Sequence, residues 1–369
     1  MTAIRKRTWT DTSSEQHTAW LVDYRDNAGK RRGKQFARKK DAEAWLTQAA
    51  WHVSQGTHTA DSQSITVAKA AEQWIERGRR DGLEPTTIAA YDQHARLHLV
   101  PLCGSKRLSQ LTTPMVEGYR DQLVDKLSRP MAIRVLRSLS SIISEAQRRG
   151  QVAQNVARNV KVKRAARQRA KAVIPSKASL RALLRAAEGA GDAQGQALVM
   201  LALFGGLRAS ELRGLAWSGL DLKGASVTIS QRADAKGKIG APKSASSRRT
   251  VPLPPSALTA LKTWKLACRA TELDLVFPSV GGKVMSHRYM SLNVLQPLLG
   301  AAKVAPLGLH DLRHAAASLW IEQRVDAKRV QTWLGHHSIQ VTFDTYGHLF
   351  EAVERDSSVA AAIEKALIG

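Results

Sequence analysis

The sequence predicts a multidomain, mainly α-helical protein with a small N-terminal β-sheet and a short antiparallel β-insert. At 369 residues the chain is longer than one ordinary hydrophobic core requires, so two or three domains are expected. Apolar residues recur at helical spacing over residues 65–159 and again over most of the chain after residue 175. The clearest β-branched runs bounded by turn residues lie near the N-terminus and around residues 225–254.

The first sixty residues predict a small sheet followed by one helix. Residues 18–24 (TAWLVDY) and 31–37 (RRGKQFA) have strand character and are joined by the turn DNAGK, and residues 39–53 show helical spacing. The predicted strands are basic, and a β-ribbon of this width fits the major groove of DNA. We therefore expect residues 1–60 to bind DNA, although a structural or oligomerisation module would show the same pattern. The residues expected to contact DNA are Arg31, Arg32 and Lys34.

Residues 64–160 predict a bundle of four helices that docks on a duplex. A polar segment, SQGTHTADSQS at residues 54–64, precedes the bundle and is expected to be flexible. The third helix begins with a threonine cap and a first-turn proline, and glycine follows the fourth. The expected helices span residues 66–80, 84–101, 112–127 and 129–149, the second ending at Pro101.

A basic segment separates this bundle from the last domain. Residues 158–171 (RNVKVKRAARQRAK) hold seven basic residues and no acid. A charge run of this kind is usually a solvated linker, and we expect this linker, residues 161–175, to lie along DNA phosphates. The last domain, residues 176–369, is expected to be mostly helical. The linker residues expected to contact phosphates are Lys161, Lys163, Arg164 and Arg167.

One β-insert interrupts the last domain. Residues 225–231 (ASVTISQ) and 248–254 (RRTVPLP) are β-branched runs. The segment between them is rich in Gly, Ser and Lys. This pattern predicts a β-hairpin with a mobile loop that carries lysine.

Charge is the strongest feature of the composition. Lysine and arginine number 56 against 31 acidic residues, a net charge of +25. Such a field favours a polyanion, either nucleic acid or an anionic membrane. The sequence shows neither an apolar run of membrane-spanning length nor a signal peptide, so nucleic acid is the better prediction. Cys103 and Cys268 form no CxxC pair, so we expect reduced cysteines and a cytoplasmic protein.

Residues 308–320 (GLHDLRHAAASLW) raise the question of a metal site. His310 and His314 are four residues apart and share one helix face, a spacing that can bind zinc. Zinc is disfavoured because Arg313 would repel a dication, Asp311 lies on another face, and no third ligand is indicated. Arginine and histidine without paired carboxylates suit a phosphate, since a guanidinium binds two oxygens at once and stays charged. We expect no metal.

Four separated motifs together resemble the tyrosine recombinase family, the lambda-integrase class of site-specific recombinases. Each motif alone has an ordinary structural explanation, and the resemblance comes from their order and spacing over residues 65–369. It implies the tyrosine recombinase fold. The motifs are G-L-R-x-S-E-L around Arg208, K-S-x-x-S-x-R from Lys243, H-x-L-R-H from His310 and L-G-H-x-S-I around His336, with Tyr346 ten residues after that histidine.

The resemblance implies how a phosphate is bound. Arg208 and Arg313 hold the scissile phosphate, and His310 and His336 complete its hydrogen-bond cage. Two auxiliary residues are also implied. Glu211 orients another side chain of the site, and His314 supports either its own helix or the surroundings of the nucleophile.

The resemblance also implies the chemistry. Tyr346 is the nucleophile, and because a phenol titrates near pH 10 it needs a cationic pocket or a base to attack at neutral pH. Lys243 is the general acid for the departing 5′ oxygen. The product is a 3′-phosphotyrosine and a free 5′ hydroxyl, which a second strand can reverse. Neither a cofactor nor ATP is expected.

The implied partner is double-stranded DNA at core and arm attachment sites, bound by a homotetramer. Accessory proteins that bend DNA or set the direction of the reaction are also expected. No interaction with a membrane is expected. The location implied is the cytoplasm of a host cell, at the nucleoid.

The C-terminal tail is expected to pack on a neighbouring protomer, because Val359, Ile363 and Leu367 recur at helical spacing. Docking of the tail on its own domain is the alternative.

The N-terminal sheet and helix resemble the arm-binding domain of phage and conjugative-element integrases. The expected function is therefore to integrate or excise a mobile element. A Xer-like resolving recombinase has the same core but usually lacks this N-terminal unit, and it is the nearest alternative. A type IB topoisomerase-like strand-passage enzyme and a non-catalytic DNA-binding protein are further alternatives.

Overall fold

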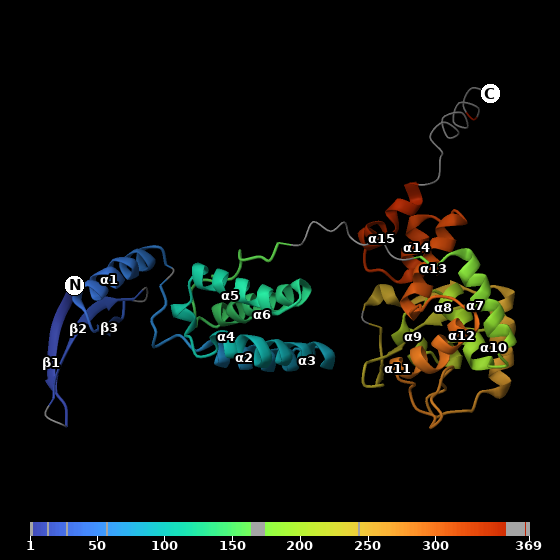
Figure 1. Cartoon of the computed structure of the whole chain (residues 1–369), viewed down its shortest axis with the longest axis horizontal. Helices are drawn as coiled ribbons and strands as arrows, with labels where there is room; N and C mark the ends of the chain where they lie inside the picture. The colour runs from blue at the N-terminus through green and yellow to red at the C-terminus, as the bar shows by residue number, and fades with distance from the viewer. Residues whose placement is uncertain are drawn as a thin grey trace. The chain divides into compact units, whose positions relative to one another are not determined.

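The computed structural model describes residues 3–12, 15–26, 29–56, 58–163, 174–242, 244–351 and 366. The polypeptide forms two compact units, residues 1–166 and 167–369 (Figure 1). Both units are rich in helix and the sheets are small and antiparallel, so the predicted fold class is confirmed. Within the described ranges, no helix is both long and apolar enough to span a membrane. The finer division of the first unit at residues 60–64 stays a prediction.

A three-stranded antiparallel sheet opens the first unit. Its order is β1 (Ala3–Thr10), β2 (Gln16–Arg25) and β3 (Arg31–Phe36), followed by helix α1 (Lys39–Ser54). The sequence predicted β2, β3 and α1 but missed β1. The sequence of β1, AIRKRTWT, is basic and almost entirely exposed, so it lacks the apolar alternation that marks a half-buried strand. Backbone pairing with β2 holds it in the sheet.

The two faces of this sheet differ. Helix α1 covers one face, where Trp45 packs against Tyr24 and Phe36 at ring-centroid distances of 5.1 and 5.6 Å. The register pairs Tyr24 with Arg32 and Val22 with Lys34, so both cations lie on the covered face. By the same alternation, the opposite face carries the arginines Arg5, Arg7, Arg25 and Arg31.

The segment after α1 was predicted to be flexible, but from His58 onward it is bonded on both sides. The Asp61 carboxylate accepts from Lys34 Nζ at 2.8 Å and from Ser109 Oγ at 2.6 Å. Arg107 Nη1 donates to the carbonyls of Asp61 and Ser64 at 2.8 and 2.6 Å. Polar composition indicated flexibility, but here the polar groups find partners on folded elements. Asp61 therefore connects the sheet to the helical bundle.

The helical bundle is built around α2 (Val67–Arg80) and α6 (Arg129–Arg148), which pack on a core that includes Trp74, Leu139 and Ile142. Thr112 caps α5 (Thr113–Lys126) as predicted, its hydroxyl accepting from the Met115 backbone N–H. The remaining helices of the bundle are α3 (Pro85–His94) and α4 (Val100–Cys103).

The predicted end of the second helix at Pro101 is wrong. A π-helical turn, Ala95–Leu99, joins α3 to α4, and the helical path continues to Cys103. Proline removes one backbone donor, and a π-helical turn changes the local bonding pattern, so the chain passes the proline without ending its helix.

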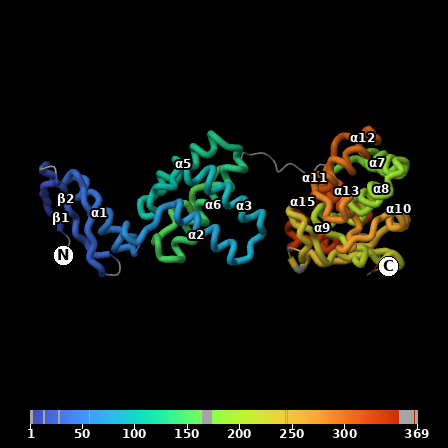
Figure 2. Tube along the Cα trace, turned by 90° about the horizontal axis from the view of Figure 1, so that it is seen from below, coloured from blue at the N-terminus to red at the C-terminus, as the bar shows by residue number. Residues whose placement is uncertain are grey.

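The second unit is built around α8 (Ala193–Phe204), whose residues from Ala197 to Leu203 are all buried. Helices α7 (Lys177–Gly189), α10 (Pro255–Ala267) and α13 (Leu309–Glu322) pack against it (Figure 2). Its other helices are α9 (Ala209–Gly214), α11 (His287–Tyr289), α12 (Gln296–Ala301), α14 (Ala327–Leu334) and α15 (Ile339–Glu351).

The predicted β-insert is confirmed. Strands β5 (Ser226–Ile229) and β8 (Arg249–Pro252) pair antiparallel, and β4 (Leu220–Asp221) adds a third strand. The intervening segment, predicted as a loop, contains a further hairpin of β6 (Arg232–Ala233) and β7 (Ile239–Gly240). The C-terminal tail that was expected to pack on a neighbour lies, apart from residue 366, outside the described residues.

Replacing Asp61 with alanine is predicted to loosen the connection between sheet and bundle. The substitution removes the acceptor shared by Lys34 and Ser109, so residues 55–64 should be cleaved several-fold faster by a protease of broad specificity. Limited proteolysis with mass spectrometry measures this rate. Asp41→Ala, an exposed change on α1, is the control and should cleave like the unmodified protein. Equal cleavage of the two variants would contradict the role given to Asp61.

Candidate active site

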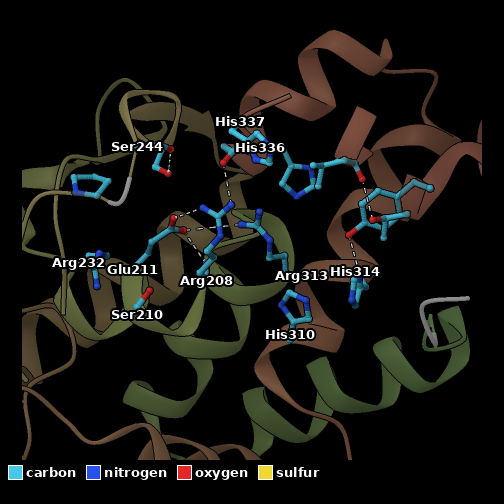
Figure 3. A pocket seen from close by; sticks show the side chains of 16 residues that line it. Arg208, Ser210, Glu211, Arg232, Ser244, His310, Arg313, His314, His336 and His337 are labelled. Atoms are coloured by element: carbon cyan, nitrogen blue, oxygen red, sulfur yellow. Dashed lines mark hydrogen bonds and ion pairs between the residues drawn. The ribbon is translucent and has the colours of Figure 1, made fainter. Parts of the chain in front are cut away.

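A pocket of about 700 Å³ in the second unit gathers residues from separate stretches of the chain (Figure 3). Helix α9, strand β6, helix α13 and the segment from α14 into α15 contribute to its wall. Glu211 is the single carboxylate among the described residues that line it. The residues expected in the site that the structure brings together here are Arg208, Glu211, His310, Arg313, His314, His336 and Tyr346.

Glu211 is the centre of the charged cluster. As the third residue of α9 it accepts from the backbone N–H of Arg208 at 2.8 Å, which fixes the start of the helix. Its carboxylate also accepts from Arg208 Nη1 at 2.9 Å and from both Nη atoms of Arg249 at 2.9 and 2.8 Å. Burial alone would raise the pKa of Glu211, but the bonds from Arg249 and the charges of Arg313 and Arg208 lower it to about 2.

The two predicted phosphate-binding arginines are held by main-chain carbonyls. Arg208 Nη2 donates to the carbonyl of Gly335 at 2.9 Å. Arg313, whose side chain is 1% exposed, donates to the carbonyls of Gly206, at 2.7 Å, and Leu334. Burial lowers the pKa of Arg313 to about 9, with a further contribution from the charge of Arg208. These bonds orient both guanidiniums before any substrate is bound, and each guanidinium has further N–H donors.

Three histidines complete the pocket. The rings of His310 and His314 meet edge to face, with centroids 4.4 Å apart. His336 Nδ1 lies 3.0 Å from the buried hydroxyl of Thr342. Burial lowers the pKa of each of the three histidines, with repulsion from neighbouring charged side chains adding to it, and the pKa of His336 falls to about 3. At neutral pH the imidazoles are therefore uncharged and can both donate and accept hydrogen bonds.

Tyr346 lies in the wall of the pocket, on α15. It is 1% exposed, and its hydroxyl lies 2.7 Å from His314 Nδ1. Burial raises the pKa of Tyr346 to about 12, although the charge of Arg313 lowers it in part. The phenol is thus protonated at neutral pH, and an imidazole that can take its proton is already in hydrogen-bond contact with it.

The structure tests few of the other expected contacts. Lys243 lies outside the described residues, while Pro242 and Ser244 on either side of it line the pocket.

The expected DNA-contact residues differ in exposure. Lys161 and Lys163 are exposed, and Arg164 and Arg167 lie outside the described residues. Arg31 is exposed on the uncovered face of the N-terminal sheet and pairs with Asp23 at 3.3 Å. Arg32 and Lys34 are paired with Asp26 and Asp61, each at 2.8 Å.

Sequence reasoning missed two charged groups of the site. Arg249 is the last residue of the K-S-x-x-S-x-R motif, so the pattern included its position. Nothing in the sequence indicated that its two Nη atoms donate to the Glu211 carboxylate. Arg232 lines the pocket from β6, in a segment that was expected to be a loop. The hydroxyl of Thr342 had no sequence signal, since its contact with His336 exists only after α15 is folded.

The expectation that the two histidines of α13 bind no zinc stays a prediction. The ligand atoms of three suitable residues lie within 4.8 Å of one another only at Asp11, Glu15 and His17, among the residues that the structure describes. That group is in the first unit, far along the sequence from the pocket. In the pocket itself, guanidiniums supply the positive charge.

Comparison with known proteins identifies the class. Residues 175–352 match the Phage integrase family. The chain is 24% identical to a XerC-like tyrosine recombinase of Caldanaerobacter subterraneus subsp. tengcongensis, over 94% of this chain and 95% of that protein. A XerC recombinase of Xanthomonas campestris pv. campestris is 33% identical over 42% of this chain but only 44% of its own length.

Solved structures share the fold. The Tn1549 transposon integrase, in complex with a circular intermediate DNA, superposes with a TM-score of 0.67 at 19% identity, over 82% of this chain and 100% of that chain. A lambda integrase dimer bound to a COC′ core site gives 0.59 at 18% identity, over 95% of each chain. A lambda integrase tetramer bound to a Holliday junction gives 0.55 at 19% identity, over 90% of this chain and 95% of that one.

Residues 175–352 match the phage integrase family, and the similar proteins found over the whole chain are tyrosine recombinases. The resemblance inferred from the four motifs is thereby confirmed. Tyrosine recombinases are enzymes that transfer DNA strands, so the enzyme class expected from the sequence is confirmed as well.

Glu211→Gln is predicted to destabilise the second unit by about 3–5 kcal/mol at neutral pH, because it leaves buried guanidiniums without their counter-charge. The pKa of Glu211 is lowered to about 2 on folding. Its charge therefore contributes stability above the ordinary pKa of a glutamate, about 4.3, and that contribution is lost as the pH falls toward about 2.

Chemical unfolding of both proteins from neutral pH down to about pH 3 measures the difference, which should shrink with acidity. The exposed Glu272→Gln serves as the control, and its unfolding should match the unmodified protein throughout. A difference for Glu211→Gln that is independent of pH would contradict the assignment of this carboxylate as the counter-ion of the arginines.

Proposed function

We propose that this protein is a site-specific tyrosine recombinase that integrates or excises a mobile element by cutting and rejoining DNA strands. The observation that carries the proposal is the placement of the Tyr346 hydroxyl, in contact with His314, in a pocket walled by Arg208 and Arg313. A cationic, carboxylate-poor pocket of this kind suits a phosphodiester, and a phenol with a base at 2.7 Å suits nucleophilic attack.

In the first step, a scissile phosphate binds between Arg208 and Arg313, with His310 and His336 donating to its oxygens. Tyr346 attacks phosphorus while its proton passes to His314 Nδ1, which is free to accept when the imidazole proton is on Nε2. The new bond joins the phenolic oxygen to the 3′ phosphate, and the bond to the 5′ oxygen breaks. Lys243 gives that oxygen its proton.

In the second step, the free 5′ hydroxyl of another strand attacks the phosphotyrosine and gives its proton to Lys243. The bond from phosphorus to the Tyr346 oxygen breaks, the phenol takes its proton back from His314, and a phosphodiester is restored. The ester keeps the energy of the original bond, so the reaction needs no ATP. Arginines stabilise the developing charge on the phosphorane, the part that metal ions take in other phosphoryl-transfer enzymes.

The first unit is proposed to supply two kinds of DNA contact. The helical bundle, residues 64–160, and the basic linker, residues 161–175, follow the core site, where strands are cut. The sheet, residues 1–60, binds a separate arm site. Because α1 covers the face that holds Arg32 and Lys34, the exposed face with Arg31 is the better candidate for the major groove.

Assembly as a tetramer on DNA is part of the proposal. Lambda integrase, which shares the fold, has been solved both as a dimer on a core site and as a tetramer on a Holliday junction. The C-terminal tail is proposed to link neighbouring protomers, and DNA-bending or directionality proteins are proposed to assist. The reaction is placed in the cytoplasm of a host cell.

A Xer-like resolving recombinase is the second candidate. The XerC-like relative aligns over 94% of this chain, so the similarity is not confined to the catalytic unit. A resolving enzyme would use core sites alone, whereas an integrase with an arm-binding sheet would need two classes of site. The two candidates therefore differ in the DNA that the sheet binds.

Tyr346→Phe is predicted to abolish the covalent complex while leaving DNA affinity within about twofold, since phosphate contacts dominate binding. The assay traps the adduct on a nicked core-site duplex, with excess EDTA present, and reads it as a band resistant to SDS. Tyr289→Phe, an exposed tyrosine of the same unit, is the control and should form the adduct. An adduct with Tyr346→Phe, or one lost on chelation in the unmodified protein, would contradict the proposal.

Arg7→Glu is predicted to weaken binding to arm-type DNA at least about tenfold, because it reverses a charge on the exposed face of the sheet. Adduct formation on core-site DNA should stay unchanged. Footprinting of the flanking attachment DNA measures both classes of site, and Lys40→Glu, the same charge change on α1, is the control. An unchanged footprint and unchanged recombination with Arg7→Glu would favour the Xer-like candidate.

A further inference from the structure

Arg249 is a buried cation next to the active site. Its side chain is 1% exposed, and it is not among the described residues that line the pocket. Both Nη atoms bond Glu211, Nη1 also donates to the Ser247 carbonyl at 3.1 Å, and Nε donates to the Trp333 carbonyl at 2.5 Å. A group enclosed in this way has its donors committed to protein and does not reach a substrate.

The carbonyl of Trp333 is the first of three consecutive acceptors. The carbonyls of Trp333, Leu334 and Gly335 accept from Arg249, Arg313 and Arg208, in that order. They belong to the C-terminus of α14, where the last carbonyls of a helix lack partners within the helix and carry partial negative charge. The three guanidiniums are thus held between this helix end and the carboxylate of Glu211.

Gly335 shows how closely Arg249 fits. Its φ of 62° is left-handed, and a Cβ at this position would lie 2.9 Å from Arg249 Nη1. The turn that ends α14 and leads to His336 is therefore packed directly on the Arg249 guanidinium. A shift of Arg249 would move the turn and Glu211 together, and with them both arginines that face the pocket.

We propose that Arg249 is a positioning residue for the strand-transfer reaction, an inference that rests on the function proposed above. It orients Arg208 through Glu211 and fixes the end of α14, on which Arg208, Arg313 and His336 depend. Its planar group is required, because three separate nitrogens of Arg249 bond the two carboxylate oxygens and the Trp333 carbonyl, whereas lysine presents all its donors from one nitrogen.

The test is Arg249→Lys in the full-length protein. Single-turnover cleavage of a nicked core-site duplex, at saturating DNA, should be slower by about 100-fold, since displacement of a catalytic group by about 1 Å costs that much. DNA affinity should stay within about twofold. The neighbouring Arg248 is exposed, so Arg248→Lys is the matched control and should cleave at the unmodified rate.

A second variant separates positioning from general loss of structure. Because Arg249 and Glu211 act partly through the bonds that join them, the double variant Arg249→Lys, Glu211→Gln should lose clearly less rate than the product of the two single losses. Should Arg249→Lys fail to fold, Glu211→Asp keeps every charge and withdraws the carboxylate by one methylene. It should likewise cleave slowly with affinity kept.

Three results would overturn the inference: cleavage by Arg249→Lys at the unmodified rate, fully additive losses in the double variant, or cleavage by Glu211→Asp at the unmodified rate. These outcomes differ from failure of the proposed function, in which the unmodified protein and Arg248→Lys would themselves form no adduct.

Discussion

The second unit depends on one arrangement of charge, in which three arginines are fixed between the carboxylate of Glu211 and the C-terminus of α14. Glu211 alone brings together α9, which carries it, and β8, which supplies Arg249. The carbonyls of α14 add α13 through Arg313. Buried ions are costly to desolvate, so such a cluster is stable only when its geometry is good and its donors are satisfied. The fold meets that requirement with main-chain acceptors.

The same arrangement explains how the pocket acts on a phosphate. Three guanidiniums share one carboxylate, so the cluster keeps excess positive charge. Both Arg208, whose side chain is 34% exposed, and the buried Arg313 line the pocket and supply this charge to it. Because the donors are oriented in advance, little reorganisation is needed when negative charge develops on a phosphorane. The histidines around them are neutral, so they shape the hydrogen bonding without adding to the field.

Much of this site followed from the sequence, because its residues lie in short motifs whose order and spacing are diagnostic. The structure places the site residues expected from those motifs in one pocket, apart from Lys243, which lies outside the described residues. Arg249 shows what motifs alone do not predict. Its two hydrogen bonds to the Glu211 carboxylate and its bond to the Trp333 carbonyl join stretches far apart in sequence. Local patterns cannot express such a contact.

In the fold, too, local patterns were predicted from the sequence and contacts between remote residues were not. Helices with caps and periodic apolar residues were predicted well, as at α2, α5 and α6. Strand β1 was missed because its partners are backbone atoms of β2 rather than apolar side chains, and the segment around Asp61 was misjudged because its polar groups are satisfied by remote residues. The helical path continues through Pro101 after a π-helical turn, and no sequence pattern predicted that turn.

We infer that the arginines are set by Glu211 and α14 before DNA binds, and an experimental structure of Tyr346→Phe on a core-site duplex would check this arrangement. We expect Arg249 still to bond both carboxylate oxygens of Glu211 at about the present 2.8–2.9 Å. We also expect a backbone phosphate to be bound by Arg208 and Arg313, with the ring of residue 346 facing it. Loss of the Glu211–Arg249 bonds, or a phosphate bound elsewhere on the second unit, would show that Glu211 and α14 do not set the arginines.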